Sequence, residues 1–309
     1  MRILLYRADG DVAPWAHDIA AALPDADIVL WHPGESTRPC DYAVLWAPPP
    51  ALLDGLAHAR AIFLMGAGAD SLLRFGEALP HVPIVRLGDA GMGEQMADYV
   101  TYAVLRYFRR FDDYERLASQ DIWNPLPLYE KRDFTVGVLG LGRLGVPVLR
   151  RVQQLGFPVR GWSRTSKDLP GVETYSGMDA LEPFLAGTRV LVCLLPLTAD
   201  TNNLLDRARL SQLPIGAYVV NVARGALLAE PDLLALIRTN HIAGATLDVF
   251  RNEPLPAPHP FWGEPRITIT PHVSAVTLRE PAVRQIAAKI VRLERGEAVD
   301  DVVDRALGY

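Results

Sequence analysis

The sequence predicts an α/β protein built from two parallel β-sheets, each covered by helices. Two observations indicate this class. Along the 309-residue chain, short apolar runs that suit buried strands alternate with segments of helical periodicity, and such alternation is typical of parallel sheets with helical crossovers. A turn with the spacing G-x-G-x-x-G, at Gly140, Gly142 and Gly145, separates a predicted strand from a predicted helix. The length favours two domains rather than one.

The first part of the chain predicts a flavodoxin-like domain. Its expected strands cover residues 2–6, 27–31, 42–46 and 61–65, with helices over 13–23 and 51–59 between them. A long helix is expected over 93–119, with one apolar stripe made of Met96, Val100, Val104, Tyr107 and Phe111. We interpret this helix as a crossover between domains. An amphipathic helix over 279–295 is expected to return the chain to the first domain.

The second part predicts a doubly wound, Rossmann-like domain. Its expected strands cover residues 135–139, 159–162, 190–194, 218–222, 244–249 and 267–270, with helices over 206–212 and 230–239. We therefore divide the chain into a first domain of residues 1–95 plus 278–309 and a second domain of residues 96–277.

Composition argues against several functions. Lysine and arginine number 31 against 36 aspartate and glutamate, a formal net charge of −5 without a basic or acidic block, so neither nucleic acid nor a membrane is expected as a partner. The 2 cysteines and the absence of metal-ligand spacings such as H-E-x-x-H predict no disulfide framework and no metal site. Because no signal peptide and no apolar run of about 18 residues occurs, we expect a cytoplasmic protein.

The glycine-rich turn has the pattern of a dinucleotide site. Gly140 allows a tight turn, Gly142 lets a pyrophosphate approach the backbone, and Gly145 lets the helix pack close to the sheet. Free N–H groups at the helix N-terminus favour the diphosphate. An ordinary tight turn without a ligand is the alternative, which the strand–turn–helix context disfavours.

The end of the next strand indicates which dinucleotide is bound. NAD enzymes usually place an acidic residue there, to bind the ribose 2′-hydroxyl. This chain has Ser163, Arg164 and Thr165 instead, and a guanidinium with two hydroxyls can bind a 2′-phosphate that a carboxylate would repel. We expect NADP, with NADPH preferred over NADH; a solvated basic turn is the alternative.

Two loops of the first domain follow strands, where open α/β sheets bind ligands. One begins at Trp46 and continues into three prolines. The other contains Gly66, Ala67 and Gly68, whose successive backbone N–H groups could bind a carboxylate. From the residues alone, an ordinary glycine turn explains the second loop equally well.

Three residues that carry charge stand just after consecutive strands of the second domain: Arg224, Glu253 and His272. Because the ends of parallel strands converge on one edge, these side chains can meet. An arginine can hold a carboxylate and polarise the adjacent carbonyl. A protonated histidine can deliver a proton to oxygen as hydride reaches carbon, and a carboxylate stabilises the imidazolium. Each residue alone is commonly a surface residue, but the combination predicts reduction of a 2-oxo acid.

Five stretches with characteristic spelling follow one another along the second domain: GLGRLG (140–145), LLPLTADT (194–201), NVARGALL (221–228), LDVFRNEPLP (247–256) and TPHVSAVT (270–277). Together they resemble the D-isomer-specific 2-hydroxyacid dehydrogenase family. MGAGADSLL (65–73) and GMGEQMADYV (91–100) extend the resemblance over essentially the whole chain, and are similar to the members that reduce glyoxylate and hydroxypyruvate.

The resemblance implies roles for particular residues. Arg224 corresponds to the arginine that binds substrate, Glu253 to the carboxylate that orients the histidine, and His272 to the acid/base histidine. The 66–68 loop corresponds to the backbone site for the substrate carboxylate, and Trp46 to an aromatic residue of the substrate pocket. Cofactor contacts are expected from the glycine turn and from the strand ends beside it: Arg143, Leu144, Leu195, Pro196, Val222, Ala223 and Asp248.

The expected function is therefore the NADPH-dependent reduction of glyoxylate to glycolate and of hydroxypyruvate to glycerate, by a homodimer. One alternative is a reductase of a bulkier 2-oxo acid. Another is a dinucleotide-sensing binding protein on the same fold, which turnover of NADPH with a panel of 2-oxo acids would distinguish.

Overall fold

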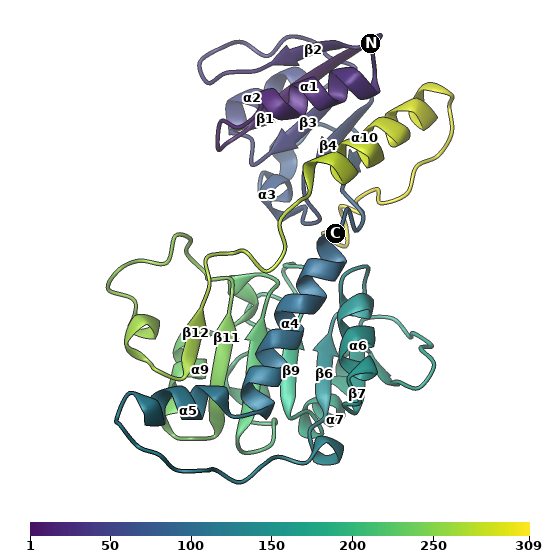
Figure 1. Cartoon of the computed structure of the whole chain (residues 1–309). Coiled ribbons are helices and arrows are strands. Elements are labelled where there is room, and N and C mark those ends of the chain that lie inside the picture. The colour runs from purple at the N-terminus through teal and green to yellow at the C-terminus, as the bar shows by residue number, and fades with distance from the viewer. The chain divides into compact units, whose positions relative to one another are not determined.

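The computed structural model describes residues 1–309, which form two compact units. Unit 1 consists of residues 1–91 and 277–309, and unit 2 of residues 92–276. Each unit is a parallel sheet covered by helices (Figure 1), which confirms the predicted fold class. The structure divides the chain just before helix α4, Met92–Phe108, which belongs entirely to unit 2.

Unit 1 has a five-stranded sheet in the order β2-β1-β3-β4-β5, the strand order of a flavodoxin-like fold. Its strands are β1 (Arg2–Arg7), β2 (Asp27–Leu30), β3 (Tyr42–Trp46), β4 (Ala61–Leu64) and β5 (Ile84–Val85). The helices α1 (Ala13–Ala22) and α10 (Arg279–Glu294) pack against each other. The Tyr42 hydroxyl donates to Glu294 Oε1 at 2.6 Å and so ties α10 to the sheet.

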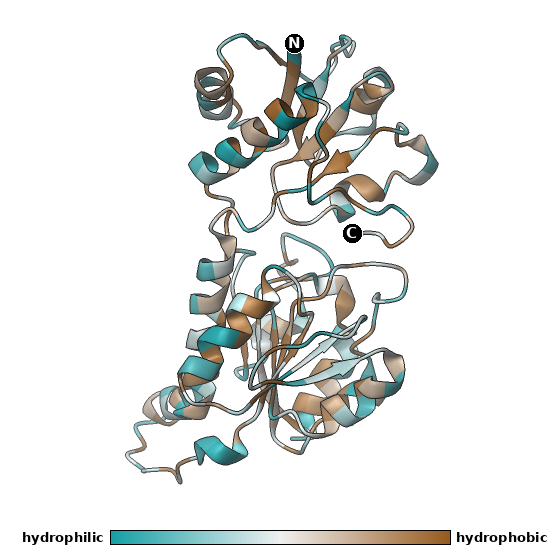
Figure 2. Cartoon of the chain, turned by 90° about the vertical axis from the view of Figure 1, so that its right-hand side faces the viewer, coloured by the Kyte–Doolittle hydropathy of each residue, from teal (hydrophilic) through white to brown (hydrophobic).

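The other face of this sheet carries a separate apolar core. It joins strand residues such as Leu4, Leu45 and Ile62 to the short helices α2 (Pro50–Leu53), η1 (Asp54–Leu56) and α3 (Asp70–Leu73). Strands covered on both faces must be apolar throughout, which explains the continuous runs in the sequence. Figure 2 shows this pattern as strands in brown, with teal on the helices.

Unit 2 has a seven-stranded sheet in the order β12-β11-β10-β9-β6-β7-β8. Its strands are β6 (Val136–Leu139), β7 (Val159–Ser163), β8 (Glu173–Ser176), β9 (Val190–Cys193), β10 (Ala217–Asn221), β11 (Ile242–Leu247) and β12 (Ile267–Ile269). The chain runs outward from β6 in one direction and from β9 in the other. The carboxyl ends of β6 and β9 therefore mark the topological switch point, where doubly wound sheets bind their ligands.

Helices cover both faces of the second sheet. One core packs α4 and α6 (Gly145–Gln154) against the strands, and α4 and α6 lie side by side in Figure 1. The other core packs α7 (Leu181–Ala186), α8 (Arg207–Leu210) and α9 (Glu230–Arg238) against the opposite face.

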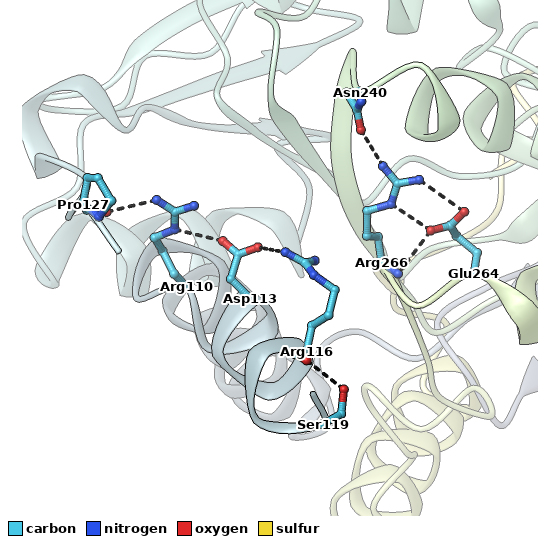
Figure 3. Close-up of polar contacts among 8 residues, drawn as sticks. All are labelled: Arg110, Asp113, Arg116, Ser119, Pro127, Asn240, Glu264 and Arg266. Atoms are coloured by element: carbon cyan, nitrogen blue, oxygen red, sulfur yellow. Dashed lines mark hydrogen bonds and ion pairs between the residues drawn. The ribbon is translucent and has the colours of Figure 1, made fainter. Parts of the chain in front are cut away.

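The prediction of one continuous helix over 93–119 is wrong, because the helix is interrupted in its C-terminal half. The chain breaks at Arg110, which has φ 60°, and a second helix, α5 (Phe111–Ala118), begins after it. Asp113 accepts from Arg110 Nε at 2.9 Å and from Arg116 at 2.6 Å, and Arg110 also donates to the Pro127 carbonyl at 3.1 Å (Figure 3). These contacts stabilise the left-handed residue. Phe111 consequently leaves the buried stripe and is 49% exposed.

Candidate active site

The glycine-rich turn lies at the switch point, between β6 and α6. Gly140 has φ 104°, and a Cβ there would lie 2.6 Å from the Leu194 carbonyl oxygen. A Cβ at Gly145 would lie 1.8 Å from the Gly140 carbonyl oxygen. A Cβ at Gly142, by contrast, would have no atom within 4 Å. Folding therefore requires the first and third glycines, whereas the space beside the second is open to a ligand.

The residues expected to contact the cofactor stand at the carboxyl ends of neighbouring strands. Ser163 ends β7 and is buried, and its hydroxyl donates to the Thr165 carbonyl at 2.8 Å, whereas Arg164 and Thr165 are exposed. Leu195 and Pro196 follow β9, and Val222 and Ala223 follow β10. Arg143 and Leu144 lie in the glycine turn, the first exposed and the second half-buried.

Glu253 and His272 form a hydrogen-bonded pair. Glu253 Oε2 lies 2.7 Å from His272 Nδ1, and Glu253 Oε1 accepts from the Phe250 N–H at 2.9 Å. Burial alone would raise the pKa of Glu253. The hydrogen bonds from His272 and Phe250 and the charges of His272 and Arg224 outweigh burial, so the pKa of Glu253 is lowered. Glu253 is therefore an anion at neutral pH.

The turn that carries Arg224 packs directly on the segment that leads to Glu253. A Cβ at Gly225 would lie 1.9 Å from the Phe250 carbonyl carbon, so only glycine permits this approach. The fully buried Asn221 braces the turn, because its side chain donates to the Arg224 carbonyl at 3.0 Å and accepts from the Ala223 N–H at 3.2 Å. Sequence reasoning missed Asn221; its only signal is an amide at the end of an apolar strand.

Asp248 fixes the loop that carries His272. Its buried carboxylate accepts from the Thr270 hydroxyl at 2.6 Å and from the N–H groups of Val273 and Ser274, each at 2.8 Å. Its carbonyl accepts from the His272 N–H at 2.8 Å. These bonds hold His272 at φ 56°, a backbone conformation that non-glycine residues rarely adopt. The cofactor contact expected of Asp248 stays a prediction, whereas its contacts with this loop were not foreseen.

Strand β12, which precedes this loop, is anchored at its start. Arg266 donates from Nε to Glu264 at 2.8 Å and from Nη1 to the Asn240 side chain at 2.8 Å (Figure 3). The hydrogen bond and charge of Arg266 lower the pKa of Glu264. The edge strand is thus held at one end by an ion pair and at the other by Asp248.

The residues expected to bind the substrate carboxylate lie together in unit 1. Trp46 ends β3 and is 40% exposed, and the 66–68 loop follows the neighbouring β4. The Trp46 ring atom Cζ3 would lie 3.7 Å from a Cβ at Gly66. The N–H groups of Ala67 and Gly68 take no part in the hydrogen bonds within the protein. The structure thus places an aromatic ring beside two available backbone donors.

The structure offers neither a cluster of metal-ligating side chains nor a helix that could cross a membrane. No three His, Cys, Asp or Glu side chains gather in a way that could hold a metal ion. None of the helices combines the length and apolar character that crossing a bilayer requires.

Comparison with known proteins defines the class of this site. The family described as "D-isomer specific 2-hydroxyacid dehydrogenase, NAD binding domain" matches residues 101–274. The chain belongs to the D-isomer-specific 2-hydroxyacid dehydrogenase family, as the motifs indicated, and is an NAD(P)-dependent dehydrogenase.

Several individual proteins are similar to this chain over its full length. The chain is similar to the glyoxylate/hydroxypyruvate reductase A of Citrobacter koseri, at 46% identity over 314 residues and 100% of both chains. Among solved structures, it is similar to a D-isomer-specific 2-hydroxyacid dehydrogenase from Xanthobacter autotrophicus in complex with NADPH and MES, with 38% identity, a TM-score of 0.95 and coverage of 100% and 99% of the two chains. An NADPH-dependent glyoxylate/hydroxypyruvate reductase from Sinorhizobium meliloti, in complex with NADP and sulfate, has 32% identity, a TM-score of 0.92 and the same coverage.

Proposed function

We propose that this protein reduces glyoxylate to glycolate and hydroxypyruvate to glycerate, with NADPH as the reductant. The observation that carries the proposal is the hydrogen-bonded pair of Glu253 and His272, which lies at the carboxyl edge of a sheet with a dinucleotide-binding turn. The relatives named for this reaction support the choice of substrates.

The residues at the switch point fit NADP. The open space at Gly142 leaves room for a pyrophosphate against the backbone. The exposed Arg164 and Thr165 after β7 offer a cation and a hydroxyl to a 2′-phosphate. Two of the similar solved structures hold NADPH or NADP.

The chemistry divides among three side chains. The hydride for the substrate carbonyl carbon would come from NADPH, held by the glycine-rich turn and the strand ends beside it. Arg224 pairs with the substrate carboxylate and withdraws electron density from the neighbouring carbonyl through its planar set of donors. Its charge also lowers the pKa of Glu253, so the cation and the anion of the site stabilise each other.

His272 delivers the proton. Its Nδ1 lies against the Glu253 carboxylate, so Nδ1 carries a proton and Nε2 is the nitrogen that faces away from the pair. In the protonated ring, Nε2–H passes its proton to the substrate oxygen as that oxygen gains negative charge. The reaction consumes one 2-oxo acid, one NADPH and one proton, and yields one 2-hydroxy acid and one NADP.

The 66–68 loop binds the substrate carboxylate through backbone N–H groups, and Trp46 limits the size of the substituent. A short loop with unpaired donors favours an anion. The indole ring beside it disfavours bulky 2-oxo acids, which is why we place the small acids first.

We further propose that the protein is a cytoplasmic homodimer. Trp123 is 100% exposed, Leu128 is 74% exposed and Phe111 is 49% exposed. We take these exposed apolar side chains as candidates for the dimer contact, because exposed apolar patches commonly mark protein interfaces. Sedimentation should show a dimer for the wild-type protein and a weaker dimer for Trp123→Ser. A monomeric wild-type protein would refute the proposal.

The direct test is the loss of NADPH absorbance with glyoxylate and with hydroxypyruvate, repeated with NADH. We expect turnover with both acids and a higher kcat/KM for NADPH. Bound NADPH without turnover on any 2-oxo acid would instead indicate a dinucleotide-binding protein. A higher kcat/KM for phenylpyruvate than for glyoxylate would indicate a bulkier substrate.

The role of His272 is tested by His272→Gln, with the exposed His81 of unit 1 changed to glutamine as the matched control. We expect His272→Gln to lower kcat by about 10²–10⁴-fold, because the proton donor is lost. Its Kd for NADPH should stay near the wild-type value, and His81→Gln should change neither quantity. Equal loss of turnover and cofactor binding would contradict the assigned role.

A further inference from the structure

Arg7 lies between two tryptophan rings at the carboxyl edge of the unit 1 sheet. It is the last residue of β1 and pairs in register with Trp46, the last residue of β3. Its guanidinium carbon lies 5.1 Å from the centroid of the Trp15 ring and 5.4 Å from the centroid of the Trp46 ring. The Arg7 side chain is only 13% exposed, so the guanidinium is largely shielded from solvent.

The remaining donors of Arg7 are directed to neighbouring groups. Nε donates to Asp9 Oδ1 at 3.0 Å and Nη2 donates to Asp9 Oδ2, which makes a two-pronged ion pair. Nη1 approaches the Met65 sulfur at 3.9 Å, one residue before the 66–68 loop. The hydrogen bond from Arg7 lowers the pKa of Asp9, so the carboxylate is ionised at neutral pH. Asp9 bonds the edge of the guanidinium through Nε and Nη2, so it does not compete with the rings for the guanidinium faces.

Trp46 depends on these contacts for its orientation. The indole is 40% exposed, and its Cζ3 lies near Gly66, so solvent borders much of the ring. Trp15, in contrast, is 3% exposed and belongs to α1. Arg7 therefore links the buried Trp15 ring to the exposed Trp46 ring, which borders the 66–68 loop. A shielded cation over an indole face stabilises that geometry.

From this arrangement we infer that Arg7 is a positioning residue, which holds the Trp46 ring beside the 66–68 loop and thereby sets the preference for small 2-oxo acids. The inference rests on the proposed function, because it concerns the substrate of that reaction. It also accounts for a largely buried arginine side chain at the end of β1.

The test compares kcat/KM for glyoxylate with kcat/KM for the bulkier phenylpyruvate, in wild-type protein and in Arg7→Leu. Leucine keeps the apolar stem and removes the guanidinium. We expect the ratio of glyoxylate to phenylpyruvate to fall by about 3- to 30-fold, because the ring loses a cation–π contact of ordinary strength. KM for NADPH should not change. Arg7→Lys, which keeps the charge without the planar fork, should restore the ratio only in part.

A double-mutant cycle shows whether Arg7 acts through Trp46. If it does, Arg7→Leu changes the ratio in the wild-type background but not in the Trp46→Leu background, because the ring to be positioned is gone. Additive effects, or an unchanged ratio in Arg7→Leu, would overturn the inference. Asp9→Asn is the matched control: it removes the ion pair but leaves the stack, and should shift the ratio less than Arg7→Leu.

A readout without turnover separates this inference from the proposed function. The contribution of Trp46 to the fluorescence is obtained by subtracting the emission of Trp46→Phe from that of the wild-type protein. Acrylamide quenching of this contribution reports how freely the ring moves. Arg7→Leu should raise the quenching, whereas equal quenching would refute the positioning role even if the wild-type protein reduces no 2-oxo acid. A wild-type protein that is inactive with glyoxylate refutes the proposed function alone. Thermal unfolding identifies a variant that fails to fold, and Arg7→Lys then serves for both measurements.

Discussion

Replacing Gly142 with alanine separates cofactor binding from folding in the glycine-rich turn. A Cβ at this position meets no atom within 4 Å, and the residue is exposed. Replacing glycine by alanine at a site that tolerates it stabilises a protein by about 0.4–1 kcal/mol. We therefore expect the Tm of Gly142→Ala to stay the same or to rise slightly.

The bound cofactor should respond in the opposite direction. A methyl group at Gly142 would occupy the space that we assign to the approach of the pyrophosphate to the backbone. A displacement of the diphosphate that removes one charge-assisted hydrogen bond costs about 1.5–3 kcal/mol, which corresponds to roughly a 10- to 100-fold weaker Kd for NADPH. Fluorescence titration with NADPH measures the Kd, and differential scanning fluorimetry of the same samples measures the Tm.

Gly145→Ala is the matched comparison. Its Cβ would lie 1.8 Å from the Gly140 carbonyl oxygen, so the backbone must move, and overpacking of this kind costs about 1–3 kcal/mol. We expect this variant to lose stability as well as cofactor affinity. If Gly142→Ala instead lowered the Tm and left the Kd for NADPH unchanged, the assignment of the open space to the pyrophosphate would be wrong.

Three further changes have defined outcomes. Asp248→Ala leaves two backbone N–H groups and a hydroxyl without their acceptor, which should cost about 3–5 kcal/mol of the free energy of unfolding and be seen as a lower urea midpoint; a loss below about 1 kcal/mol would contradict this account. Arg164→Ser should lower kcat/KM for NADPH by about 10- to 100-fold and leave that for NADH nearly unchanged, and equal losses would refute a 2′-phosphate contact. The pKa of Glu253 is lowered below the usual value of 4.5. Its carboxylate, and the stability that the carboxylate contributes, should therefore persist above pH 4.5 and be lost only as the pH falls through the lowered pKa. A fall of kcat/KM on the acid side of neutral pH that Glu253→Gln removes would contradict the lowered pKa.

Most strands were predictable because burial on both faces requires apolar runs. The strand at residues 42–46 has the expected bounds, and the neighbouring strands of both sheets differ by a residue or two. Two strands were missed. Strand β5 (Ile84–Val85) has only two residues, too few to make a detectable apolar run, and strand β8 lacks such a run altogether. It is an edge strand of the second sheet, and residues such as Glu173 and Ser176 are exposed, so it carries no apolar run to detect.

The break at Arg110 was not predictable from local sequence. Neither glycine nor proline is found between Gly93 and Ser119, and the chain reads as one continuous helix. The left-handed residue is stabilised by Asp113 and by the Pro127 carbonyl, the second of which is a contact between segments that only the fold brings together.

The candidate site was likewise predictable only in part from the sequence. Strand-end reasoning placed Glu253 and His272 on one edge, and the structure brings them to 2.7 Å. It did not identify Asn221, which braces the Arg224 turn, or the contacts by which Asp248 fixes the loop of His272, because a buried amide or carboxylate looks in sequence like any other polar residue after a strand. Their function follows from hydrogen bonds that depend on the tertiary structure.

The dependence of His272 on Asp248 links the proposed catalytic histidine to the edge of the sheet. His272 has a left-handed backbone conformation that non-glycine residues rarely adopt, so contacts from other residues must maintain it. The Asp248 carboxylate provides these contacts and also anchors the end of the edge strand β12. Loosening of β12 would therefore misdirect His272, the proposed proton donor, while the central strands remain folded. Heating or mild denaturant should abolish turnover before the bulk of the protein unfolds.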